Sequence, residues 1–169
     1  VSTFRSKGGS RTSKTDKGIV LRDNFYGTIM EDAFRRDFTI NSLYLDINDM
    51  KIIDYTGGFK DLNKRELSSI GDSKLRFRED PIRIIRAVRF QCNLDLKLKK
   101  SLKKDLINFA HLLQEIPPAR RYEEILKLFL TGNAKNNFIA LLEFHILKYL
   151  LPVTEKECSN KKHKSFILN

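Results

Sequence analysis

The chain has 169 residues, of which 41% are hydrophobic, and it carries a formal net charge of +11. This length allows one domain or two small ones, and the hydrophobic content suffices for a real core. The positive charge favours nucleic acid or another polyanion as partner, although lysines on solvated faces would produce the same excess. The longest apolar run, Phe138–Leu151, carries charges and is too short for a membrane span, so no membrane is expected as partner.

Cysteine usage and short motifs narrow the chemistry further. Cys92 and Cys158 are the only cysteines, and they stand far apart without the spacing of a metal site. Reduced thiols in a cytoplasmic protein are therefore expected. No Cys/His cluster, P-loop or nucleophile elbow occurs, so the sequence itself suggests no metal ligand and no nucleophile.

The N-terminal part reads as a small mixed structure. Val1–Arg5 alternates as a strand does, and Ser6–Lys17 has the composition of a mobile basic loop. Glu31–Arg36 is typical of a short charged helical turn. We expect two strands joined as a hairpin at Asn48-Asp49, a helical turn after a glycine pair, and a further short strand: Ser42–Ile47, Lys51–Tyr55, Phe59–Leu62 and Leu67–Ile70.

From Asp72 onward the pattern changes to consecutive helices without a strand signal. His111 and His145 lie in apolar helical patterns and are expected to be packed. The predicted fold class is α+β, with a mixed part at residues 1–71, a helical part at residues 72–152 and a basic flexible tail at residues 153–169. The four expected helices are Asp80–Asn93, Leu98–Gln114, Ala119–Leu130 and Phe138–Leu151.

Arg76–Phe90 (RFREDPIRIIRAVRF) concentrates five arginines, two carboxylates and a proline. Pro81 suits the first position of a helix, and Asp80 before it suits the N-cap. Glu79, Asp80 and Arg83 then share one face, while an apolar stripe formed by Ile84, Ile85, Val88 and Phe90 lies opposite. Such a helix is either a salt-bridged structural helix or a reader of a nucleotide base.

Glu31–Leu43 (EDAFRRDFTINSL) is the second informative stretch. Arg35 and Arg36 offer guanidinium forks that match phosphate oxygens, and Asp37 with Asn41 could satisfy ribose hydroxyls. A charged surface turn, with Asp37 as a cap, explains the same residues equally well.

Five blocks, in order, resemble the bacterial class II nucleotidyltransferases, the family of poly(A) polymerases and CCA-adding tRNA nucleotidyltransferases. The resemblance covers about residues 1–152, and LRDNFYGTI and IPPAR are more similar to a poly(A) polymerase. The blocks are VSTFR, LRDNFYGTIMEDAFRRDFTINSLYLD, DYTGGFKDL, RFREDPIRIIRAVRF and IPPARRYEEILKLF.

The resemblance implies roles for individual residues. It places the incoming nucleotide's triphosphate and ribose at Arg35, Arg36, Asp37 and Asn41, and it assigns the base edge to Asp80 and Arg83. A base-reading Asp80 could not give all its acceptor capacity to its own helix, so Glu79 or the loop would carry more of the cap. Supporting roles fall to Arg76, Glu79, Arg86, Arg120, Glu123 and Glu124, and a flexible connector to Asp54, Gly57, Gly58 and Asp61.

The implied fold is the C-terminal part of a nucleotidyltransferase head followed by a helical neck. The implied activity is template-independent addition of AMP from ATP to RNA 3′ ends, with Mg²⁺ as cofactor. The metal-binding carboxylates are expected upstream of residue 1, so no catalytic residue is assigned and the chain alone is expected to be inactive. A fragment of a CCA-adding enzyme and a non-enzymatic RNA-binding remnant remain the alternatives. The sequence does not indicate an oligomeric state.

Overall fold

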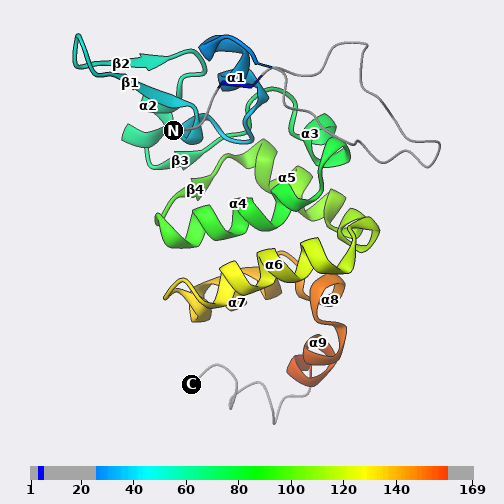
Figure 1. Cartoon of the computed structure of the whole chain (residues 1–169). Helices are drawn as coiled ribbons and strands as arrows, with labels where there is room; N and C mark the ends of the chain where they lie inside the picture. Colours follow the sequence, from blue (N-terminus) through cyan, green and yellow to red (C-terminus); the bar gives the residue numbers. More distant parts are fainter. Residues whose placement is uncertain (1–3, 6–25, 160–169) are drawn as a thin grey trace, which may run out of the picture. The chain divides into compact units, whose positions relative to one another are not determined.

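The computed structural model describes residues 4–5 and 26–159. Contacts within the chain divide it into two compact units, an N-terminal unit (Val1–Lys64) and a C-terminal unit (Arg65–Asn169). Figure 1 shows the first in blue to cyan and the second in green to orange. The division lies before the boundary predicted at Gly71, because a short strand after Lys64 pairs within the C-terminal unit.

The N-terminal unit begins its described part with helix α1 (Ile29–Arg35). Thr28 and Glu31 form a capping box, in which each side chain accepts a hydrogen bond from the other's backbone N–H at 3.2 and 2.7 Å. The helix confirms the predicted charged turn. Arg5 forms an isolated antiparallel bridge with Tyr26, while the predicted strand residues 1–3 and loop 6–17 lie outside the described residues.

The predicted hairpin is confirmed. Strands β1 (Leu43–Asp46) and β2 (Lys51–Asp54) pair antiparallel, with Leu43 opposite Asp54 and Asp46 opposite Lys51. The 3₁₀ helix η1 (Thr39–Asn41) precedes β1, and helix α2 (Gly58–Asn63) follows β2. After the hairpin the chain folds back, so that α2 packs against η1.

The C-terminal unit contains two strands that sequence periodicity locates poorly. Strand β3 (Glu66–Leu67) pairs in parallel with β4 (Lys97–Leu98). The first lies near the strand predicted at Leu67–Ile70. The second contradicts the prediction of no strand after Asp72, because two residues are too few to show an alternating pattern.

The segment around Pro81 forms two helices, α3 (Ser73–Glu79) and α4 (Ile82–Asn93), where one was predicted. Asp72 caps α3 by accepting a hydrogen bond from Lys74 N–H at 2.9 Å. Pro81 was predicted at N1, the first helical position, but it occupies the N-cap of α4, so the helix begins one residue later than predicted. The apolar stripe of α4 is confirmed at Ile84, Ile85 and Val88, which are fully buried, whereas Phe90 is only partly buried.

The remaining helices complete this unit, and Figure 1 shows α4, α6 and α7 as successive long helices. Helix α4 packs against α6 and α7, and α3 packs against α5. The bounds are α5 (Lys100–Phe109), the 3₁₀ helix η2 (Ala110–Glu115), α6 (Pro118–Phe129), α7 (Ala134–Glu143), α8 (Leu147–Leu150) and α9 (Pro152–Ser159).

Three predictions for this region are wrong. The helix predicted at Phe138–Leu151 breaks at His145, whose backbone is left-handed with φ of 56°. Both His111 and His145 are exposed, because each lies at a turn-like end of an element rather than on its buried face. The tail predicted as flexible from residue 153 begins with α9, which packs against α8.

Candidate functional site

The paired arginines of the N-terminal unit surround a buried carboxylate. Asp32, only 3% exposed, accepts hydrogen bonds from Arg36 Nε at 2.9 Å, Arg35 Nη2 at 3.3 Å, Tyr44 Oη at 2.9 Å and Arg5 N–H at 3.3 Å. Arg36 Nη2 also lies 2.8 Å from Asp32 Oδ2. The pairs have i,i+3 and i,i+4 spacing at the C-terminal end of α1, where the helix dipole favours positive charge.

These hydrogen bonds determine the charge state of Asp32. Burial alone would raise its pKa, but the donors Arg36, Tyr44, Arg5 and Arg35 outweigh burial and lower the pKa from 3.8 to about 2. Burial and the hydrogen bond to Asp32 raise the pKa of Tyr44. Asp32 is therefore an anion throughout the physiological pH range, and its charge offsets part of the arginine pair.

The predicted ribose residues come together directly. Asp37 is 8% exposed and accepts hydrogen bonds from Phe38 N–H and from Asn41 Nδ2, both at 2.9 Å. Arg36 Nη1 donates to Asn41 O at 2.9 Å. The structure thus joins Arg35, Arg36, Asp37 and Asn41 in one network, although Asp37 and Asn41 also perform the turn-capping role that was the alternative interpretation.

The glycine pair closes a tight turn through Asp54. The carboxylate of Asp54 accepts hydrogen bonds from the N–H groups of Thr56, Gly57, Gly58 and Phe59 at 2.8–3.1 Å. Burial opposes ionisation, but these four donors lower the pKa of Asp54. Asp61 accepts a hydrogen bond from Thr39 Oγ1 at 2.8 Å. Asp54 therefore holds the turn into α2, and Asp61 on α2 is joined to Thr39 of η1.

In the C-terminal unit, Glu79 joins two arginines across the α3–α4 junction. Glu79 Oε2 accepts from Arg76 Nη1 and from Arg83 Nη1, both at 3.1 Å. Arg76 is 5% exposed and also donates from Nε to Ile70 O at 3.1 Å. Arg83 Nη1 further donates to Arg76 O at 3.0 Å. Arg76 is thus a structural residue, and Arg83 keeps Nε and Nη2 without a hydrogen-bond partner among the described residues.

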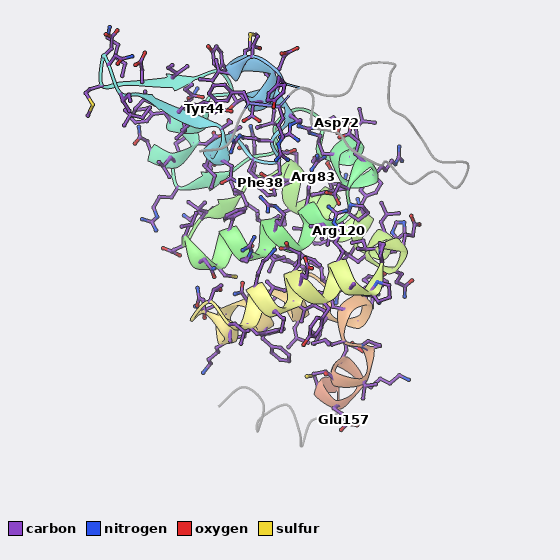
Figure 2. All side chains as sticks on the ribbon, in the orientation of Figure 1. Phe38, Tyr44, Asp72, Arg83, Arg120 and Glu157 are labelled. Carbon is purple, nitrogen blue, oxygen red and sulfur yellow. The ribbon has the colours of Figure 1, made fainter. Side chains whose placement is uncertain are left out.

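Asp80 divides its two carboxylate oxygens between two tasks. Oδ1 accepts from Ile82 N–H at 3.3 Å, which caps α4, and Oδ2 accepts from Arg120 Nη2 at 2.7 Å. Figure 2 shows Arg83 on α4 and Arg120 at the start of α6. The prediction of Asp80 as the N-cap residue is wrong, because Pro81 holds that position and Asp80 accepts from Ile82 N–H from one residue further out. Each oxygen retains a lone pair for another donor. Asp80 and Arg83 are held separately, by Arg120 and Glu79.

Helix α6 contacts α4 at a second charged point. Glu124 is 6% exposed, lies 3.6 Å from Arg89 Nη2 and accepts a hydrogen bond from Lys127 Nζ at 2.7 Å. The guanidinium groups of Arg86 and Arg89 both lie over the Phe90 ring on α4. Their central carbons are 5.4 and 5.3 Å from the ring centre, respectively. Glu123 is exposed, whereas Arg120 pairs with Asp80 just before α4 and Glu124 pairs with Arg89 on α4.

Sequence reasoning missed Asp32 and Tyr44 as members of the arginine network. The spacing of Asp32 from Arg35 and Arg36 could have revealed the first, because side chains three and four residues apart meet on a helix. Tyr44 lies on β1, twelve residues from Asp32, and no local signal joins the two.

Metal-ligand groups and membrane-spanning helices are two further features to consider in the described part of the chain. Within residues 4–5 and 26–159, no group of three or more His, Cys, Asp or Glu side chains is arranged to hold a metal ion. None of the helices in the same residues is long and apolar enough to cross a membrane.

Comparisons with known proteins agree with the two-part organisation. A family described as "Poly A polymerase head domain" matches residues 1–68, and one described as "Probable RNA and SrmB- binding site of polymerase A" matches residues 95–158. Poly(A) polymerase I of Salmonella typhi is 43% identical over 90% of this chain and 34% of its own length. A CCA-adding enzyme of Streptococcus uberis is 38% identical over 75% of this chain and 31% of its own length.

A solved structure, the Bacillus stearothermophilus CCA-adding enzyme in complex with CTP, matches with a TM-score of 0.71. It is 34% identical, and the match covers 79% of this chain and 34% of that one. The chain therefore belongs to the nucleotidyltransferase family of bacterial poly(A) polymerases and CCA-adding enzymes. It spans about a third of the length of the curated relatives it matches.

Proposed function

We propose that this chain is the nucleotide-selecting part of a template-independent adenylyltransferase that adds AMP from ATP to RNA 3′ ends. The observation that carries the proposal is the likeness to poly(A) polymerase I, which is 43% identical over 90% of the chain. The likeness to a CCA-adding enzyme is lower, at 38% over 75%. The net charge of +11 supports RNA as the second substrate, and the free thiols support a cytoplasmic location.

In the proposed reaction, the RNA 3′ hydroxyl oxygen attacks the α-phosphorus of ATP. A new P–O bond forms, the bond to the bridging oxygen breaks, and pyrophosphate leaves while the hydroxyl proton is released. Phosphoryl transfer depends mainly on positioning and charge stabilisation. The complete enzyme is expected to use Mg²⁺ for the latter, and no step is assigned to the metal because the described residues contain no group of side chains arranged to hold it.

The residues of this chain would hold the nucleotide. Arginine at the end of α1 would bind phosphate oxygens, and Asp37 with Asn41 would face the ribose. Arg83 would donate to a ring nitrogen of the base, and Asp80 would accept from its exocyclic amino group. Adenine and cytosine both present an acceptor nitrogen beside an amino group, so this pair alone cannot separate ATP from CTP.

The test is primer extension by protein expressed from the complete reading frame. Each nucleoside triphosphate is supplied alone, with Mg²⁺ and a labelled RNA primer, and long tails are expected from ATP only. The 169 residues alone are expected to give no extension. Asp80→Ala in the complete enzyme is expected to reduce the preference for ATP over GTP and UTP with little loss of stability. Equal use of ATP and CTP by the parent enzyme would contradict the proposal.

A CCA-adding enzyme is the second candidate, favoured by the solved CCA-adding structure with CTP. It differs in its products, because it would add a short defined end from CTP and ATP to a tRNA lacking that end. Incorporation of CTP before ATP on a tRNA substrate, with no long tail on other RNAs, would establish this candidate and exclude the first.

A non-enzymatic RNA-binding protein is the third candidate. It predicts RNA binding that weakens steeply with salt, since phosphates would dominate the contacts, and no extension by the complete protein. The gene sequence upstream of residue 1 distinguishes this candidate from the two enzymes. An in-frame Gly-Gly and Asp-x-Asp segment supports an enzyme, and lack of that segment in the gene supports the binding protein.

A further inference from the structure

The two adjacent arginines at the end of α1 are held unequally. Arg36 engages three of its nitrogen atoms, with Nε and Nη2 on Asp32 and Nη1 on Asn41 O at 2.9 Å. Its guanidinium also lies over the Tyr44 ring, 5.3 Å from the ring centre. A guanidinium group with three bound nitrogen atoms and an aromatic ring against its face is fixed in one orientation. Arg36 therefore joins the end of α1 to the start of the hairpin.

Arg35 is held much more loosely. Its one hydrogen bond to another described residue runs from Nη2 to Asp32 Oδ1 at 3.3 Å, and its Nε has no partner among the described residues. About a third of its side chain is exposed, and it lines a pocket of about 410 Å³ with Thr28, Met30, Glu31 and Phe34. The Nε atom of Arg35 is buried, so Nη1 and Nη2 are the groups left to meet a ligand, whereas the nitrogen atoms of Arg36 are largely occupied.

Asp32 is the group that makes this difference. It is buried, ionised and in contact with both arginines and with the Tyr44 hydroxyl. We propose that Asp32 is a positioning residue for nucleotide binding: it fixes Arg36, although that side chain is 41% exposed, as a structural link to Asn41, and it aims Arg35 at the phosphates. This proposal rests on the proposed function and divides roles that the sequence resemblance assigned equally to the two arginines.

The sign of one substitution separates positioning from simple charge neutralisation. Asp32→Asn removes one negative charge beside two arginines, so electrostatics alone would tighten binding of a polyanion. The amide also turns a pair of acceptor oxygens into one acceptor and one donor, which releases the Arg36 fork and the orientation of Arg35. If positioning dominates, binding weakens although the site has become more positive.

The experiment uses the complete protein and measures the KM for ATP, kcat and inhibition by tripolyphosphate. Asp32→Asn is expected to raise both the KM for ATP and the inhibition constant for tripolyphosphate about tenfold. Arg35→Gln should do the same by removing the phosphate contact. The double variant with Asp32→Asn and Arg35→Gln should raise the two constants little more than either single substitution, because both substitutions remove the same phosphate contact.

A stability-matched control separates positioning from unfolding. Ser42→Ala removes a buried hydroxyl that donates to Thr39 O at 2.8 Å, so it weakens the same unit without contacting either arginine. It should lower the melting temperature and leave the KM for ATP unchanged. An unchanged or lower KM and inhibition constant in Asp32→Asn would overturn the proposal. A parent enzyme that binds tripolyphosphate, measured by calorimetry, but extends no primer would instead refute the proposed function alone.

Discussion

The two units bury different kinds of side chain. Among the described residues, Ala33 and Phe38 are the buried hydrophobic side chains of the N-terminal unit, and all the others belong to the C-terminal unit. The N-terminal unit instead buries polar groups, including Asp32, Asp37 and Ser42. Several apolar side chains on its hairpin are exposed: Leu45, Ile47, Met50 and Ile52.

The difference shows what holds each unit together. In the N-terminal unit, carboxylates collect N–H and O–H donors, as Asp32 does with side chains and Asp54 does with four backbone groups. In the C-terminal unit, α4 packs against α6 and α7, and α3 packs against α5, around many buried apolar side chains. Arg76, Asp105 and Glu124 are buried beside them. Charge and turn geometry should therefore control the first unit, and side-chain volume the second.

The largest effect is expected from a cavity in the C-terminal unit. Ile85 on α4 is fully buried, so Ile85→Ala should lower the free energy of unfolding by about 2–5 kcal/mol. Urea denaturation followed by circular dichroism measures this loss. Leu45→Ala in the N-terminal unit is the matched control, since Leu45 is 55% exposed and its truncation should change stability by less than about 1 kcal/mol. Equal losses would remove the contrast between the units.

The glycine pair provides the next largest effect, in the N-terminal unit. A Cβ on Gly58 would lie 2.2 Å from Thr39 O, so Gly58→Ala must move backbone and should cost about 3 kcal/mol. Gly57 has φ of 81° but open space around its Cβ position, so Gly57→Ala should cost only about 1 kcal/mol. Amide hydrogen exchange in α2 and the hairpin would measure both losses. A larger loss at Gly57 would show that backbone conformation outweighs the close approach.

Acid should destabilise the N-terminal unit through Asp32. Its pKa is lowered from 3.8 to about 2 on folding, so the stabilisation is complete above pH 3.8 and disappears as the pH falls toward 2. The loss amounts to about 2 kcal/mol. Hydrogen exchange of the hairpin between pH 5 and about pH 2 measures this change. Asp32→Asn should remove this part of the pH dependence, whereas the exposed Asp49→Asn should retain it.

Much of this architecture follows from local sequence. The hairpin, α2 and the buried stripe of α4 were predictable because their alternation, glycines and helical spacing are strong local signals. Helix α3 was missed because its seven residues show hardly two turns of periodicity. The break at His145 was missed because no Gly, Asn or Pro marks that left-handed position.

The candidate sites were predictable to different degrees. The pairing of Glu79 with Arg83 follows from i,i+4 spacing on neighbouring helical turns. The contact between Asp80 and Arg120 joins residues 40 apart, so no local pattern contains it and only the family resemblance suggested it. The unequal roles of Arg35 and Arg36 depend on Tyr44 and Asn41, which folding brings to them.

The smallest effect on stability, and the clearest on function, is expected at Arg120. Its side chain is 54% exposed and that of Asp80 is 25% exposed, so their ion pair should contribute only about 0.5 kcal/mol to stability. The hydrogen bond of 2.7 Å nevertheless fixes one oxygen of the carboxylate proposed to read the base. Arg120→Gln should therefore leave unfolding nearly unchanged while reducing the preference of the complete enzyme for ATP over GTP, whose base presents the opposite donor and acceptor pattern.

Arg121→Gln is the matched control for that change. Arg121 follows Arg120 on α6 but donates to Leu113 O at 3.3 Å, away from Asp80. Its substitution should leave the ATP-to-GTP ratio of kcat/KM as in the parent. If Arg120→Gln lowered stability by several kcal/mol and kept the nucleotide preference, the charged edge of α4 would be structural. The C-terminal unit would then use its arginines as the N-terminal unit uses Arg36, to join elements rather than to contact a ligand.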